Sequence, residues 1–69
     1  MYINIEVRTD SADTLHKISQ AIQNEPTRHS NISCGYANIS IVYNCQKNEM
    51  GKIKSYWKSV VPDCLVVSV

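Results

Sequence analysis

The side chains in this sequence with the most reactive chemistry are two histidines and three cysteines. Cys34, Cys45 and Cys64 stand in unrelated spacings, whereas structural zinc sites present paired ligands such as C-x₂₋₄-C. No cysteine has a histidine close in sequence to activate it as a nucleophile. Carboxylates are few and scattered, and there is no glycine-rich phosphate loop. We therefore expect no catalytic residue, no metal and no cofactor, and a protein that is not an enzyme.

Hydrophobic periodicity predicts the first strand and the first helix. Residues 2–8 alternate polar and apolar side chains, which predicts a half-buried strand. The residues expected on its core face are Ile3, Ile5 and Val7. Residues 9–11 offer capping side chains for a helix that ends before Pro26. Its apolar stripe is expected at Leu15, Ile18 and Ile22.

Residues 31–44 predict a β-hairpin that turns at Gly35-Tyr36, because glycine suits the first central position of a type II′ turn. This turn pairs Cys34 with Ala37 and places Ile32 opposite Ile39. The side chains then expected on the core face are Ile32, Cys34, Ala37, Ile39, Ile41 and Tyr43.

A loop is expected at residues 44–47, followed by a second helix that closes at Pro62. The apolar stripe of that helix is expected at Met50, Ile53, Trp57 and Val60. A last strand is predicted to run to Val69. Its core face is expected to carry Leu65, Val67 and Val69, and its open face Cys64, Val66 and Ser68.

The resulting order is strand, helix, strand, strand, helix, strand within one domain of residues 1–69. It predicts an α+β fold, a ferredoxin-like split βαβ sandwich with a four-stranded antiparallel sheet and two helices on one face. A chain of this length buries only roughly 60% of the surface that its unfolded form exposes. Dimerisation or a larger partner would add buried surface.

Composition narrows the class of protein. The chain is 43% hydrophobic and 19% charged, which is typical of a globular protein. It has no apolar run of about 18 residues and no secretory signal at its start, so we expect a cytoplasmic protein with no membrane segment. The net charge of +1 argues against a main role in gripping nucleic acid.

Residues 34–41 read Cys-Gly-Tyr-Ala-Asn-Ile-Ser-Ile, and Tyr2 lies in the first predicted strand. This segment resembles the third-strand signature of RNA-recognition motifs, basic-Gly-aromatic-small-aromatic-aliphatic-x-aromatic. Gly35, Tyr36, Ala37 and Ile39 match that signature, whereas the basic position and the later aromatic positions hold Cys34, Asn38 and Ile41. The resemblance implies an open sheet on which Tyr2 and Tyr36 stack bases.

A second candidate surface is the predicted second helix. Lys47, Lys54 and Lys58 align along one of its sides at spacings of seven and four, with Tyr56 beside them. Such a stripe is either the solvated face of an amphipathic helix or an electrostatic docking strip for an acidic partner.

From these features we predict a small non-enzymatic binding protein that docks on or blocks a larger protein or ribonucleoprotein. The residues expected to bind the partner are Tyr2, Asn4, Tyr36, Asn38, Lys47, Lys54, Tyr56 and Lys58. The Asn/Ile/Ser/Lys-rich composition resembles small accessory proteins of phages and mobile elements, including inhibitors of host defence systems. One alternative is an RNA- or single-strand-binding module, and another is a self-associating regulatory domain that forms a homodimer.

Overall fold

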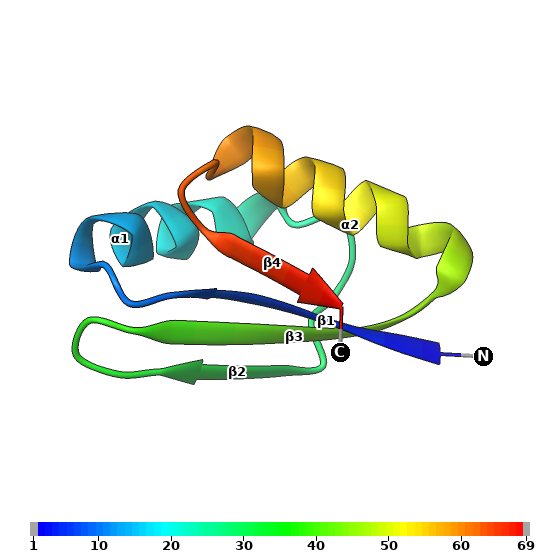
Figure 1. The fold of residues 1–69 in the computed structure, drawn as a ribbon, viewed down its shortest axis with the longest axis horizontal. Helices are drawn as coiled ribbons and strands as arrows, with labels where there is room; N and C mark the ends of the chain where they lie inside the picture. Colours follow the sequence, from blue (N-terminus) through cyan, green and yellow to red (C-terminus); the bar gives the residue numbers. More distant parts are fainter. Residues whose placement is uncertain (1, 69) are drawn as a thin grey trace.

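The computed structural model, which describes residues 2–68, has a four-stranded sheet with two helices packed on one face (Figure 1). Its elements are β1 (Tyr2–Thr9), α1 (Ala12–Ala21), the short 3₁₀ helix η1 (Ile22–Asn24), β2 (Asn31–Cys34), β3 (Ile39–Gln46), α2 (Lys47–Val60) and β4 (Leu65–Ser68). The strand order is β2-β3-β1-β4, and every neighbouring pair is antiparallel. The predicted α+β class, element order and four-stranded antiparallel sheet are therefore confirmed.

Local sequence explains the first two elements. In β1 the alternation buries Ile5 and Val7 completely on the helix side of the sheet. Ser11 then caps α1 by accepting a hydrogen bond from the backbone N–H of Thr14 at 3.5 Å. The apolar stripe of α1 is centred on Ile18, which is fully buried.

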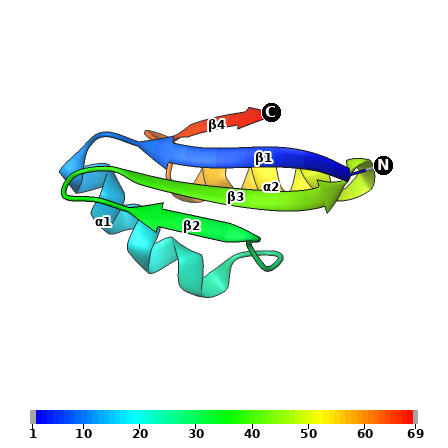
Figure 2. The ribbon, with the colours of Figure 1, turned by 90° about the horizontal axis from the view of Figure 1, so that it is seen from below.

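The hydrophobic core lies between the sheet and the two helices, and the opposite sheet face has no helix on it (Figure 2). Its largest members are Trp57 from α2 and Tyr43 from β3, both fully buried. The remaining buried hydrophobic residues are Ile5, Val7, Ile18, Ala21, Ile39, Ile41, Cys45, Ile53 and Val61. Neither helix is long and apolar enough to cross a membrane within residues 2–68.

The predicted turn of the β2–β3 hairpin is wrong. Cys34 pairs with Ile39 and Ile32 with Ile41, so a four-residue loop at 35–38 replaces the two-residue turn. Gly35 has no positive φ, which a type II′ turn requires at its first central position. The register differs from the predicted one by two residues, a shift that leaves every side chain on its original face.

The prediction that Ile32, Cys34 and Ala37 lie in the core is also wrong. Ile32 is 43% exposed and Cys34 is exposed, whereas Ala37 lies exposed in the loop. The reason is that β2 is an edge strand with a neighbouring strand on one side only. Side chains on its helix-facing side are therefore open at the flank.

The junction between β3 and α2 differs from the expected loop at 44–47. β3 continues to Gln46 and buries Cys45, and α2 begins at the next residue. At the other end of α2, Val60 was predicted to lie in the core. This prediction is wrong, because Val60 is 47% exposed. Val61 is fully buried instead, because the chain leaves the helix there with φ −130° and ψ 77°.

The face assignment of the last strand is wrong as well. Val66 lies opposite Val7, which places Val66 and its even-numbered neighbours on the helix side. Leu65 and Val67 consequently point to the open face, opposite Arg8 and Glu6. Both sets of side chains are partly apolar, so their alternation did not identify the buried one. Val69 lies outside the described residues.

Candidate functional site

The eight residues predicted to bind a partner lie in three separate places. Tyr2 and Asn4 are exposed near the start of β1, and Tyr36 and Asn38 are exposed in the hairpin loop. The other four are on α2: Lys47, Lys54, Tyr56 and Lys58. The fold therefore presents three candidate surfaces.

The two aromatic residues of the RNA-recognition resemblance are at opposite ends of the sheet. Tyr2 pairs with Gln46 at one end of the β1–β3 ladder, and Thr9 pairs with Ile39, next to the Tyr36 loop, at the other. Across an eight-residue strand this separation is roughly 25 Å. Tyr36 also precedes β3 and does not lie in it. The two rings therefore do not form a joint stacking platform on the open face.

The polar side chains of the open sheet face are hydrogen-bonded to each other. Ser40 Oγ donates to Glu6 Oε2 at 2.7 Å, and Arg8 Nη1 donates to Glu6 Oε1 at 3.3 Å. Asn44 Nδ2 donates to Asn4 Oδ1 at 2.9 Å. A partner on this face would have to displace or share these contacts, which would reduce its net gain from polar binding.

The lysines of α2 are available to solvent. Lys47 and Lys58 are exposed, and Lys54 is half-buried. Within residues 2–68 the ion pairs are Arg8–Glu6, Lys17–Asp63 and His29–Glu25, so none of them involves an α2 lysine. The positive charge of these lysines could attract an acidic surface. Exposed lysines on a helix can equally have no partner and form its solvated face.

Tyr56 has a role inside the fold. Its hydroxyl donates to the backbone oxygen of Ala21 at 2.6 Å, and its ring packs edge-on against Trp57 with a centroid distance of 5.4 Å. Burial, and secondarily the charge of Glu25, raise the pKa of Tyr56. Its hydroxyl therefore joins α2 to α1 and is already occupied.

The β2–β3 hairpin (residues 31–46) combines exposure with an absence of charge. No residue from 30 to 46 is acidic, basic or a histidine. Tyr36 is fully exposed in the loop, and Ile32 is 43% exposed on the edge strand. In the loop, Gly35 N donates to Asn38 O at 2.8 Å, a bond that continues the ladder beyond the last β2–β3 pair.

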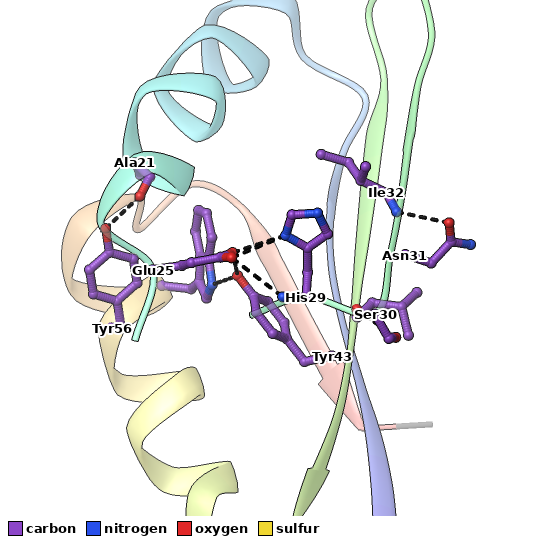
Figure 3. Close-up of polar contacts among 10 residues, drawn as sticks. Ala21, Glu25, His29, Ser30, Asn31, Ile32, Tyr43 and Tyr56 are labelled. Carbon is purple, nitrogen blue, oxygen red and sulfur yellow. Dashed lines mark hydrogen bonds and ion pairs between the residues drawn. The ribbon is translucent and has the colours of Figure 1, made fainter. Parts of the chain in front are cut away.

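A polar cluster centred on Glu25 supports the base of this hairpin (Figure 3). Tyr43 donates to Glu25 Oε2 at 2.7 Å, and the hydroxyl of Tyr43 accepts from Trp57 Nε1 at 3.1 Å. His29 N donates to Glu25 Oε1 at 3.3 Å, and His29 Nδ1 lies 3.1 Å from the same oxygen. The cluster joins the segment before β2 to β3 and to α2.

This cluster stabilises the fold and has no catalytic arrangement. Tyr43 is fully buried, and burial together with the Glu25 carboxylate raises its pKa far above the ordinary value. The hydroxyl therefore stays protonated and donates to Glu25, with no route to a substrate. The cluster was not predicted, because Glu25 directly precedes Pro26 at the expected helix end and no local pattern links it to Tyr43. The usable signal was Tyr43 itself, since a buried tyrosine hydroxyl usually requires a partner.

The three cysteines are free and differ in environment. Burial raises the pKa of the Cys45 thiol, with a smaller contribution from Glu49, and burial also raises that of Cys64. Cys34 is exposed on the edge strand. Among residues 2–68 no group of three or more His, Cys, Asp or Glu side chains could hold a metal ion.

Neither protein-family models nor curated proteins give a match to this chain. A function for this chain must therefore be inferred from the geometry of the three surfaces.

Proposed function

We propose that this chain is a non-enzymatic binding protein that docks on a larger protein or ribonucleoprotein through its β2–β3 hairpin. The observation that carries the proposal is the uncharged segment 30–46, in which Tyr36 is fully exposed and Ile32 nearly half exposed. The centres of protein interfaces are depleted in charged residues and enriched in tyrosine.

The hairpin also suits docking because it is held in place before any partner arrives. The ladder to β3 fixes β2, and the Glu25 cluster fixes the segment that leads into it. An ordered loop loses less conformational entropy on binding, so Tyr36 can act as an anchor at low cost. Among residues 2–68, Tyr36 is neither part of the hydrophobic core nor packed against it.

We also propose that the fold is of the ferredoxin-like kind, with support from the β-α-β-β-α-β order and from both helices on one sheet face. The narrower role, an accessory protein of a phage or mobile element that inhibits host defence, is supported by composition alone. In that setting the partner would be a host defence protein or ribonucleoprotein.

The docking surface is tested by comparative affinity capture from the native source. Wild type is compared with Tyr36→Ala, Tyr2→Ala and Lys58→Ala, each changing one exposed side chain on a different surface. We expect one stoichiometric partner to be lost with Tyr36→Ala, by at least tenfold, because truncating an interface hot spot costs about 2 kcal/mol or more. The other two variants should retain the partner.

The same comparison identifies the competing surfaces. Loss with Lys58→Ala but not with Tyr36→Ala would move the interface to α2. Loss with Tyr2→Ala alone would move it to the open sheet face. Either result would overturn hairpin docking, and circular dichroism of each purified variant checks that the fold is retained.

A further inference from the structure

On the edge of β2 that faces away from β3, the described backbone groups are not paired with another strand. Gly35 N donates to Asn38 O, so the 35/38 pair is a hydrogen-bonded one. Bonded and non-bonded pairs alternate along an antiparallel ladder. The backbone groups of Ser33 therefore face β3, whereas those of Ile32 and Cys34 face outward.

An independent contact confirms this orientation. The backbone N–H of Ile32 donates to Oδ1 of the preceding Asn31 at 2.9 Å and is not used by β3 (Figure 3). The adjacent side chain thus satisfies this outward donor in the single chain. A second strand could take the place of that side chain, since a strand brings carbonyl oxygens to the same position.

We propose that two copies of this chain pair through β2, antiparallel and about a two-fold axis at Ser33. Only this two-fold register sets both outward residues opposite each other, Ile32 of one copy against Cys34 of the second, and it allows about four inter-chain backbone hydrogen bonds. The Ile32 N–H then exchanges its bond to Asn31 Oδ1 for one to the Cys34 carbonyl oxygen of the second copy. The two sheets become one continuous sheet with all helices on the same side.

The choice of a second copy as the occupant rests on charge and symmetry. Edge strands are usually protected by lysine or other charged side chains, but residues 30–38 carry no charge. Self-pairing therefore opposes no like charges across the new ladder. It places the partly exposed Ile32 against a thiol on one face and Ser33 against Ser33 on the other. The net charge of +1 per copy adds little long-range repulsion.

Disulfide trapping tests the register directly, using Ser33→Cys in a Cys34→Ser background. Residue 33 opposes itself in a non-hydrogen-bonded pair, where the Cα atoms are about 4.5 Å apart, within the range of a disulfide. The matched control is Asn31→Cys in the same background. In the proposed dimer the two residues at position 31 would lie roughly 13 Å apart along the strands, which is too far for a disulfide.

We expect Ser33→Cys to form a disulfide-linked dimer in most of the protein under mild oxidation, at least tenfold more than Asn31→Cys. Wild type should sediment as a concentration-dependent dimer, and Ile32→Lys as a monomer, because it brings like charges together across the axis. Equal cross-linking of both cysteine variants, or a wild-type monomer at all concentrations measured, would overturn the proposal. A monomer would leave the β2 edge open to a strand of another protein. These measurements use purified protein alone, so their failure is separable from failure of hairpin docking.

Discussion

Replacing Tyr43 by phenylalanine removes one hydroxyl from the centre of the Glu25 cluster and leaves the ring in place. That hydroxyl accepts from Trp57 Nε1 at 3.1 Å and donates to Glu25 Oε2 at 2.7 Å. Tyr43 and Trp57 are both fully buried. Water therefore has no access to the Trp57 N–H in the folded state, whereas the Glu25 side chain is 15% exposed and can be partly hydrated.

The expected cost follows from these two contacts. A hydrogen bond to a charged group contributes about 1.5–3 kcal/mol, and a buried N–H left without a partner costs about 1–3 kcal/mol. Since the two effects share one hydroxyl, we expect Tyr43→Phe to lower the free energy of unfolding by about 2–4 kcal/mol in total. The whole free energy of unfolding of a chain this size is roughly 3–10 kcal/mol. The melting temperature should consequently fall by roughly 10–25 °C.

Urea and thermal unfolding followed by circular dichroism measure this loss. The control is Tyr36→Phe, which removes a hydroxyl from a fully exposed ring and should change the free energy of unfolding by less than about 0.5 kcal/mol. If Tyr43→Phe is as stable as Tyr36→Phe, the Glu25 cluster does not hold the fold together, and its role in positioning β2 is lost with it.

Three further predictions concern pH, thiol reactivity and packing. Burial and Glu25 raise the pKa values of Tyr43 and Tyr56 above their unfolded value near 10. Their contribution to the free energy of unfolding is therefore complete below about pH 10 and decreases as the pH rises further, by up to about 1.4 kcal/mol per pH unit for each tyrosine. Denaturant titrations between pH 10 and 12 should show this slope, reduced in Tyr43→Phe, and an equal slope in both proteins would contradict it. A thiol reagent should label exposed Cys34 within the native protein but buried Cys45 only on unfolding, and equal labelling rates would contradict the burial of Cys45. Val61→Ala should lower the free energy of unfolding by about 2 kcal/mol, because the side chain is fully buried, and a neutral result in the same unfolding assay would remove Val61 from the core.

The order of elements could be predicted from the sequence because each one has its own periodicity. The alternation of apolar residues in β1 and the apolar stripe through Ile18 are both confirmed. The residues Ile5, Val7 and Ile18 are fully buried. Those signals are local, and they depend only on which residues share one face of an element. They predicted the class of fold for the same reason.

Details that depend on neighbouring elements could not be predicted. A two-residue register shift leaves every face unchanged, so the alternation in the hairpin was equally consistent with Cys34 opposite Ala37 and Cys34 opposite Ile39. In β4 both faces carry apolar residues, and only its pairing with β1 shows that Val66 is the inward one. The exposure of Ile32 follows from the position of β2 at the sheet edge, which the sequence does not mark.

The candidate site was predictable only in part. Tyr36 was identified from its sequence context, and the structure places it fully exposed in a loop. The resemblance that paired it with Tyr2 assumed a strand position that the four-residue loop removes. The Glu25 cluster connects residues 18 and 14 positions apart along the chain, and no local pattern reports such contacts.

The most direct test of hairpin docking is site-specific photo-cross-linking in the native source. A photoreactive amino acid replaces Tyr36 in one protein and Lys58 in a second, so that the probe lies on the hairpin loop or on α2. We expect one discrete covalent adduct with a larger protein or ribonucleoprotein from position 36 and none from position 58. An adduct from position 58 alone, with none from position 36, would contradict hairpin docking.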